Sequence, residues 1–376
     1  MNILITGGAG FIGSRLALKL IDCGHHVTVL DTLSPQIHGD DPDASPLFAS
    51  IRDKVRFVRG SVTDRAVMEQ VLAGQDAVVH YAAETGTGQS MYQIDHYSTV
   101  NVGGTALLLD ILANTPHRVR RVVVASSRSI YGEGRYRSAE LGFVYPGPRA
   151  AADMEAGDFA VKHPGADAPL ELVATDEESR IHPSSVYGIT KQVQEQLVLT
   201  VCPSLGIEGV ALRYQNVFGP GQSLSNPYTG ILSIFSNLLM QGKPINVFED
   251  GTESRDFVYI DDVVDATILG LQHPAAATQA FNVGTGVPIS VFKVAETLKR
   301  LIGADVPITV TGNFRLGDIR HNYADMGKIE RMLGFRPAWD FERGIQAFVQ
   351  WARETGARES AYEASLDEMR AKGLLK

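Results

Sequence analysis

The sequence predicts an α/β fold, in which a doubly wound parallel sheet is joined to a smaller C-terminal α/β domain that binds substrate. Short apolar runs recur along the first half of the chain, and helical stretches such as 105–112 lie between them. Strands that alternate with helices in this way are typical of a parallel sheet covered by helices on both faces. The expected strands are 3–5, 27–30, 55–60, 77–83 and 122–127.

A glycine-rich turn separates the first expected strand from the helical pattern that follows it. Its glycines occupy positions 7, 10 and 13 in a G-x-x-G-x-x-G arrangement. Gly7 permits a tight turn, Gly10 lets the backbone approach a pyrophosphate, and Gly13 lets the helix pack closely on the strand. The free N–H groups at the start of that helix can then bind phosphate. The pattern predicts a dinucleotide-binding Rossmann sheet.

Asp31 directly follows the second expected strand. An acid at this position can accept hydrogen bonds from an adenosine ribose and repels an additional phosphate, which favours NAD over NADP. Ligands of doubly wound sheets bind outside the carboxyl ends of the strands. Further candidate residues at those ends are Asp64, Ala82, Ala83 and Ser127.

Tyr187 and Lys191 are four residues apart, which places both side chains on one face of a helix. A free tyrosine has a pKa near ~10 and is a poor base at neutral pH. A neighbouring ammonium group stabilises the phenolate, so we expect Lys191 to lower the pKa of Tyr187. The spacing is common on solvated helices, and it indicates a base only beside a cofactor site.

Composition and charge narrow the classes of partner. The chain of 376 residues carries a net charge of −9, which disfavours nucleic acid and anionic membranes. It begins without the segments of a signal peptide, and no apolar run reaches membrane-spanning length. Its two cysteines, Cys23 and Cys202, lie outside any metal-spaced cluster, and we expect both to be buried thiols. We therefore expect a cytoplasmic protein without a metal site.

These motifs, in this order, resemble the extended short-chain dehydrogenase/reductase family, in particular its nucleotide-sugar epimerases and dehydratases. The match covers roughly residues 1–350 and extends beyond the glycine turn, Asp31 and the Tyr187–Lys191 pair. It also includes the segments 80–83, 101, 126–132, 212–221, 255–262 and 282–286.

The resemblance implies that Ser127 is the catalytic hydroxyl, that Tyr187 is the base, and that Lys191 is its partner and holds the nicotinamide ribose. It implies a homodimer formed through the helix that carries Tyr187 and the helix after Asn101. Asn101 itself is expected to be a helix N-cap or a supporting residue, and His80 a packed core histidine. Tyr187 and Lys191 are also expected cofactor contacts, together with Phe11, Ile12, Val62 and Tyr214.

The resemblance places a nucleoside-diphosphate sugar against the second half of the chain. Arg255 and Arg315 are expected to hold the diphosphate, because a guanidinium fork suits phosphate. Asn216 is expected to contact the diphosphate or the sugar. The loop after the fourth strand supplies Glu84 and Thr85, and Arg128 is expected to shape the sugar pocket or to order the insertion that follows it.

The reaction that the family implies is epimerisation at carbon 4, by transient oxidation with NAD and return of the hydride to the opposite face. The family's 4,6-dehydratases carry an Asp-Glu pair after the catalytic hydroxyl, whereas this chain has Arg128 and Ser129 and so lacks that acid and base. Asp31 argues against an NADP-preferring reductase.

Two segments, 126–134 and 214–230, look like the dTDP-L-rhamnose 4-epimerase branch, which interconverts dTDP-L-rhamnose and dTDP-6-deoxy-L-talose. Three alternatives stay open. The first is a UDP-hexose or UDP-uronate 4-epimerase, the second is an NAD-dependent nucleotide-sugar reductase or dehydrogenase, and the third is a non-catalytic dinucleotide sensor.

The predicted domain organisation has three parts. Residues 1–187 form the NAD-binding domain and include a long insertion, 133–182. Residues 188–350 complete the Rossmann sheet and bind the nucleotide sugar, and 351–376 form a polar helical tail. Loops as long as the insertion are uncommon unless they are functional or disordered, so we expect a lid. The branch is expected to carry a Cys-x-x-Cys knuckle there, which this chain lacks.

Overall fold

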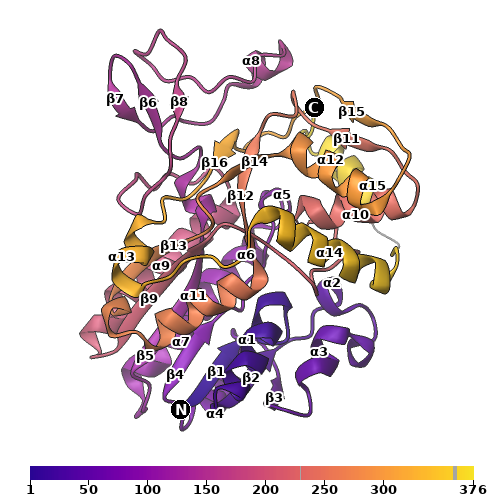
Figure 1. The fold of residues 1–376 in the computed structure, drawn as a ribbon. Helices are drawn as coiled ribbons and strands as arrows, with labels where there is room; N and C mark the ends of the chain where they lie inside the picture. Colours follow the sequence, from indigo (N-terminus) through magenta and orange to yellow (C-terminus); the bar gives the residue numbers. More distant parts are fainter. Residues whose placement is uncertain (229, 359–361) are drawn as a thin grey trace.

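The computed structural model describes residues 1–228, 230–358 and 362–376 (Figure 1). Within these residues the largest sheet has seven strands in the order β13-β9-β5-β4-β1-β2-β3, and every neighbouring pair is parallel. The strands are β1 Asn2–Thr6, β2 His26–Asp31, β3 Arg56–Arg59, β4 Ala77–His80, β5 Arg121–Ser127, β9 Glu208–Tyr214 and β13 Gln279–Val283. All five strands expected in the first half are confirmed, although β4 ends at His80 and not at Ala83.

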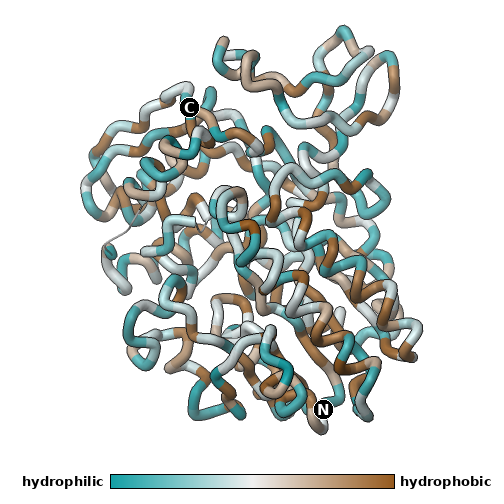
Figure 2. Tube along the Cα trace, turned by 180° about the vertical axis from the view of Figure 1, so that it is seen from behind, coloured by the Kyte–Doolittle hydropathy of each residue, from teal (hydrophilic) through white to brown (hydrophobic). Residues whose placement is uncertain are grey.

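The sheet is doubly wound because side chains along each strand point alternately to its two faces. Ile3 and Ile5 of β1 belong to the core beneath α1 and α11, whereas Leu4 between them belongs to the core beneath α4, α7 and α9. Figure 2 shows hydrophobic residues running through the central strands and the helices that cover them. These helices are α1 Phe11–Asp22, α4 Arg65–Leu72, α7 Gly104–Asn114, α9 Val186–Ser204 and α11 Ile260–Gln272.

The parts of the second half that lie outside the large sheet form a smaller lobe, at the upper right of Figure 1. Two small sheets lie in it, one with strands β10, β12, β14 and β16 and one with β11 and β15. Helices α10, α12 and α14 pack on them around a third core. The bounds are β10 Asn216–Phe218, α10 Ile231–Met240, β11 Ile245–Val247, β12 Ser254–Tyr259, β14 Pro288–Ser290, α12 Val291–Ile302, β15 Ile308–Val310, β16 His321–Asn322 and α14 Phe341–Thr355.

The shorter elements connect these parts. They are α2 Pro35–His38, η1 Pro42–Ala44, α3 Pro46–Ile51, α5 Thr87–Ser90, α6 Ile94–Tyr97, the π-helical η2 Ser98–Gly103, η3 Arg128–Tyr131, η4 Pro274–Ala276 and α13 Gly327–Leu333. The division of the chain at 187 and 350 stays a prediction, since β9 and β13 belong to the same sheet as the strands before them.

The insertion 133–182 is fully described and projects from the body at the upper left of Figure 1. It contains a small antiparallel sheet, in which β6 pairs with both β7 and β8. Its base is fixed by Arg149, whose buried guanidinium donates to both carboxylate oxygens of Glu249 at 2.7 and 2.8 Å. A role as a lid stays a prediction. The elements are β6 Tyr136–Ser138, β7 Gly142–Val144, α8 Ala151–Glu155 and β8 Glu171–Leu172.

The tail predicted from 351 consists of the end of α14 and a further helix, α15 Tyr362–Ala371. After α15, Leu375 pairs antiparallel with Arg315.

The expectation of two buried thiols is confirmed for Cys202, which is buried in α9. It is wrong for Cys23, which is exposed because it immediately follows the last turn of α1. In the described parts of the chain, no helix combines the length and the apolar character needed to cross a bilayer.

Candidate active site

The glycine turn after β1 fits a pyrophosphate. Gly7 has a φ of +67°, and a Cβ there would lie 2.7 Å from the amide nitrogen of Ala82. A Cβ on Gly13 would lie 2.5 Å from the carbonyl oxygen of Gly7, so α1 can pack this closely only with glycine. Gly10 is the N-cap of α1, and among the described residues no side chain caps that helix. Its first N–H groups are therefore available to a phosphate.

Asp31 lies at the carboxyl end of β2, beside this turn. Its two carboxylate oxygens accept hydrogen bonds from the amides of Ala9 at 3.0 Å and Leu33 at 2.9 Å. These bonds orient the carboxylate and leave lone pairs for ribose hydroxyls. The remaining lone pairs of Asp31 therefore fit the ribose hydroxyls at the adenosine end of NAD.

The other expected cofactor residues lie around the same edge of the sheet. Asp64 uses its carboxylate to cap α4, accepting from the amide of Val67 at 3.2 Å. The Tyr214 hydroxyl lies 2.9 Å from that of Tyr81 and 2.7 Å from that of Thr267. Val62 is buried, and Phe11 and Ile12 pack at the start of α1 against the core of the smaller lobe, while Ala82 and Ala83 follow β4.

Ser127 and Tyr187 are brought together from β5 and α9. The Ser127 side chain approaches the Tyr187 phenol closely enough to act to lower its pKa, and the Ser127 hydroxyl accepts from the amide and the hydroxyl of Ser129 at 3.1 and 2.9 Å. Tyr187 lies in the first turn of α9, which is capped by Ser185 through the amide of Gly188 at 3.1 Å. The cap fixes the helix start and with it the direction of the phenol.

Lys191 lies one turn after Tyr187 and is buried. Its ammonium donates to the carbonyl of Ala125 at 3.0 Å and lies 5.9 Å from the centroid of the Tyr187 ring. Burial lowers the pKa of Lys191 to about 7. The expectation of a lowered pKa for Tyr187 is wrong for this arrangement. Burial raises it, and this outweighs the lowering by the Ser127 side chain and the charge of Arg128.

His80 and Asn101 have structural roles. The two ring nitrogens of His80 contact Thr6 at 2.8 Å and Thr105 at 3.0 Å. Burial, and then the charge of Lys191, lower the pKa of His80 to about 3, so the expectation of a core histidine is confirmed.

Asn101 lies within the π-helical turn η2 and is not an N-cap there. Its side-chain amide donates to Thr190 of α9 at 2.9 Å and exchanges hydrogen bonds with the backbone of Glu84 at 2.7 and 3.1 Å. It therefore joins the loop after β4 to α9, which agrees with the expected supporting role.

The arginines expected for the substrate converge on one carboxylate, Asp318. Arg255 and Arg315 lie 3.0 and 3.1 Å from its two oxygens. Burial opposes ionisation of Asp318, but the guanidinium groups of Arg315, Arg255 and Arg128 hold its pKa at about 2. Sequence reasoning did not single out Asp318, although an acid three residues after an arginine was a visible signal.

The remaining expected substrate residues lie beside this cluster. Arg128 donates to Asn216 at 2.8 Å, and burial, followed by repulsion from Arg255, lowers the pKa of Arg128 to about 10. In the loop after β4, Glu84 contacts His96 at 3.2 Å, and the Thr85 carbonyl accepts from Tyr97 at 2.7 Å.

A narrow cavity of about 20 Å³ lies among several of these segments. The tail residues Met369 and Leu374, which sequence reasoning missed, form part of its lining. The other lining residues are Thr87, Gly88, Met91, Ser184, Ser185, Arg315, Leu316, Gly317 and Asp318.

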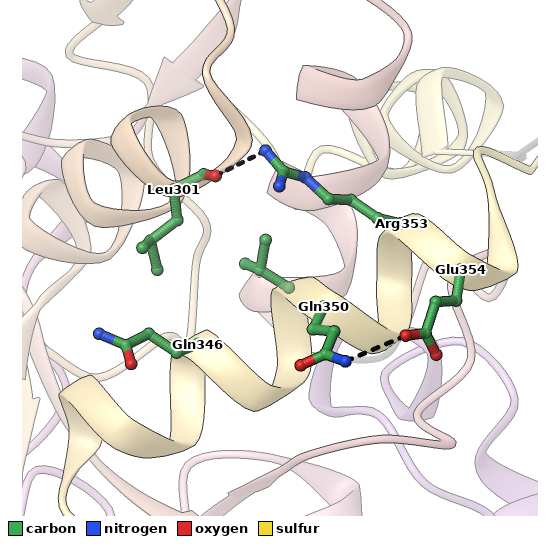
Figure 3. Close-up of a pocket in the computed structure, with 6 residues that line it drawn as sticks. Leu301, Gln346, Gln350, Arg353 and Glu354 are labelled. Atoms are coloured by element: carbon green, nitrogen blue, oxygen red, sulfur yellow. Dashed lines mark hydrogen bonds between the residues drawn. The ribbon is translucent and has the colours of Figure 1, made fainter.

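A larger surface groove, of about 450 Å³, is lined by Leu301 of α12 and five residues of α14 (Figure 3). In it, Arg353 donates to the carbonyl of Leu301 at 2.8 Å, and Gln350 donates to Glu354 at 3.1 Å. The groove contains no residue expected for the reaction.

Across the described ranges, His, Cys, Asp and Glu side chains nowhere gather in groups of three that could hold a metal ion.

The chain is similar to known nucleotide-sugar enzymes along nearly its whole length. It is 38% identical over 352 residues to a dTDP-L-rhamnose 4-epimerase of Burkholderia thailandensis, a match that covers 93% of this chain and 94% of the relative. The crystal structure of the UDP-glucose 4-epimerase of Thermotoga maritima with UDP-glucose has a TM-score of 0.75 and 28% identity, over 94% of this chain and 99% of that one.

A further solved structure, MoeE5 in complex with UDP-glucose and NAD, has a TM-score of 0.71 and 28% identity, over 94% of this chain and 99% of that one. Residues 3–150 and 161–284 match the family described as NAD dependent epimerase/dehydratase family. With its parallel sheet, glycine turn and Ser127–Tyr187–Lys191 group, the chain belongs to this family of NAD-dependent nucleotide-sugar enzymes.

Proposed function

We propose that the protein is a 4-epimerase of a dTDP-6-deoxyhexose, which interconverts dTDP-L-rhamnose and dTDP-6-deoxy-L-talose. The observation that carries the chemistry is the placement of Ser127 beside Tyr187, with Lys191 one turn away, at the carboxyl end of β5. The choice of sugar is supported by the 38% identity to the Burkholderia thailandensis enzyme.

In the proposed reaction, Tyr187 removes the proton from the hydroxyl on carbon 4, and Ser127 holds that oxygen through a hydrogen bond. When bound, NAD would supply the hydride acceptor for oxidation of carbon 4 and the hydride donor for reduction of the ketone from its opposite face. The positive charges of Lys191 and of the nicotinamide favour the phenolate and so oppose the burial that raises the pKa of Tyr187. The cycle needs no other oxidant.

The substrate's diphosphate is proposed to bind Arg255 and Arg315. Guanidinium groups give paired hydrogen bonds to phosphate, which would replace part of their present pairing with Asp318. Binding energy from the nucleotide leaves the sugar free to turn between the two hydride transfers.

Loss of water, as in a 4,6-dehydratase, is disfavoured by the two residues after Ser127. Arg128 is already protonated at neutral pH, so it cannot accept a proton, and it donates to Asn216. Ser129 donates to Ser127. Neither residue supplies the carboxylic acid and carboxylate that such an elimination uses.

NMR spectroscopy of the sugar's anomeric protons tests the proposal. With dTDP-L-rhamnose, catalytic amounts of NAD-loaded enzyme should produce the signals of dTDP-6-deoxy-L-talose until both epimers are present, without lasting absorbance of NADH. Turnover of UDP-glucose or UDP-glucuronate in place of the dTDP sugar would establish the UDP-sugar alternative, which the likeness to the Thermotoga maritima enzyme favours. Stoichiometric NADH without an epimer would identify a dehydrogenase.

We also propose a homodimer in which α9 and α7 of one protomer pack against those of its partner. Ile189 of α9, an apolar side chain on the helix expected in the interface, is 49% exposed. Light scattering on wild type and Ile189→Glu tests this, and a monomeric wild-type protein would reject it.

A further inference from the structure

The C-terminal segment 362–376 lies against the part of the chain where substrate is expected. It contains α15 and the short strand-like end at Leu375. Its Met369 and Leu374 line the same cavity as Ser184 and Ser185, which directly precede the catalytic helix, and as Arg315 and Asp318.

Backbone hydrogen bonds join the end of the chain to the segment that carries Arg315. The amide of Phe314 donates to the carbonyl of Lys376 at 2.9 Å, and the amide of Lys376 donates back to Phe314 at 3.0 Å. The amide of Leu316 donates to the carbonyl of Leu374 at 2.9 Å. A movement of the tail would therefore shift or break the backbone hydrogen bonds on either side of Arg315.

Hydrogen bonds among two tyrosine hydroxyls and one carboxylate connect the tail to both halves of the chain. Tyr92 follows the loop after β4, Tyr228 belongs to the loop before α10, and Glu368 belongs to α15. The Tyr92 and Tyr228 hydroxyls lie 3.0 Å apart and donate to one oxygen of Glu368 at 3.1 and 3.2 Å. The tail thus bridges two loops that meet only in the folded protein.

The cavity wall supplied by the tail is apolar and closely fitted. Met369 is 5% exposed, and its sulfur would lie 3.3 Å from a Cβ placed on Gly88. Met91, Leu316 and Leu374 add further apolar side chains to a lining that also contains the charged Arg315 and Asp318. A lining that combines charged and apolar side chains suits a ligand with a diphosphate and a less polar sugar or base.

The cavity's size determines how such a ligand could enter. A volume of about 20 Å³ holds about one water molecule, whereas small-molecule sites occupy several hundred Å³, roughly 300–1,000. The remaining anchors of the tail include exposed ion pairs, Lys243–Glu363 at 3.2 Å and Lys376–Glu155 at 2.5 Å. Exposed pairs of this kind contribute little, typically about 0–1 kcal/mol.

We propose that residues 362–376 are a movable wall of the substrate pocket. The segment separates from the loop 87–92 to admit a nucleoside-diphosphate sugar and then packs on the bound ligand through Met369 and Leu374. The nature of the ligand rests on the proposed function, but the movement of the wall depends only on nucleotide binding. Met369 and Leu374 are then specificity-determining residues for the part of the ligand next to the diphosphate.

Hydrogen exchange measured by mass spectrometry tests the movement in the full-length, NAD-loaded protein. Adding dTDP-L-rhamnose or dTDP should slow exchange in the peptides covering α15 by at least about 5-fold, because the wall closes on the ligand. Unchanged exchange at saturating ligand overturns the proposal. Protection by dTDP without any epimerisation would reject the proposed function and leave the movable wall supported.

A matched pair of variants tests the contact. Met369→Ala should weaken binding of the dTDP sugar about 10-fold, or about 1.4 kcal/mol, with little change in NAD content. Arg370→Ala, next to it on α15 but paired with Asp367 at the surface, should bind as wild type does. If Met369→Ala does not fold, Glu368→Gln replaces it as the test variant. It weakens the hydrogen bonds to Tyr92 and Tyr228, and it should also weaken binding of the dTDP sugar. Wild-type affinity in the folded variant overturns the proposal.

Discussion

Arg128 donates from Nε to Oδ1 of Asn216 at 2.8 Å, across 88 residues of sequence. The bond joins the residue next to Ser127 to the first residue of β10, and so connects the large sheet to the smaller lobe. Both residues were expected to contact substrate. We propose that the two residues act together as one side of the sugar pocket.

Arg128→Ala should therefore raise the KM for the nucleotide sugar about 10-fold, with a smaller change in kcat, because it removes a buried charge-assisted hydrogen bond. Arg128→Lys should restore little of the lost affinity for the nucleotide sugar, since an ammonium cannot reproduce the direction of the Nε–H group. Steady-state kinetics measure both parameters. The exposed Arg120→Ala is the control, and a wild-type KM in Arg128→Ala would contradict a role in the pocket.

Tyr187→Phe should lower kcat by at least about 100-fold, since it removes the group that moves the proton, while NAD and dTDP bind as before. Tyr136→Phe is a matched control, because the buried Tyr136 hydroxyl has no hydrogen-bond partner among the described residues. Turnover and ligand affinity are measured on both variants. Full turnover by Tyr187→Phe would show that another group is the base.

Gly7→Ala and Gly24→Ala separate backbone strain from steric clash. Both glycines have positive φ, +67° and +79°, but only a Cβ on Gly7 meets backbone, at 2.7 Å from the Ala82 nitrogen; one on Gly24 meets no described atom within 4 Å. We expect Gly24→Ala to cost about 1 kcal/mol and to keep NAD, within the roughly 1–3 kcal/mol of such strain.

Gly7→Ala should cost clearly more and should also lose NAD, because the turn must shift away from Ala82. Urea unfolding measures the free energies, and the absorbance ratio at 260 and 280 nm reports the retained cofactor. Equal losses in the two variants would mean that strain alone, and not the close approach to Ala82, governs the turn.

Lys191→Met should change how stability depends on pH. Burial lowers the pKa of Lys191 to about 7 in the folded protein, against roughly 10.4 in an unfolded chain. Between these values the unfolded state holds more protons, so the free energy of unfolding rises with pH. Below about pH 7 the ammonium is charged in both states, and the cost of burying it is present in full.

The gain in stability of Lys191→Met over wild type should therefore be largest at or below about pH 7 and should shrink as the pH approaches roughly 10. Urea unfolding across this range, at equal NAD content, measures it. Lys54→Met, at an exposed position, should show no such trend. A gain that does not change with pH would contradict the burial of a charged group.

Local patterns in the sequence were sufficient for the fold. The apolar runs, the glycine turn and Asp31 predicted the parallel sheet and its cofactor edge, because strand burial and tight turns depend on residues close together in the chain. The pairing of Tyr187 with Ser127 could be predicted only from the family's motif, since the two residues lie on different elements of secondary structure.

The sequence by itself thus determined the doubly wound sheet, the NAD-binding turn and the Tyr187–Lys191 pair, since each of these is encoded in short-range spacing. Only the tertiary structure decided that Arg255 and Arg315 meet at Asp318 and that the tail lies against the substrate loops. It also decided that burial raises the pKa of Tyr187. Ion pairing, cavity walls and desolvation depend on which distant segments exclude water together, and no local pattern specifies that.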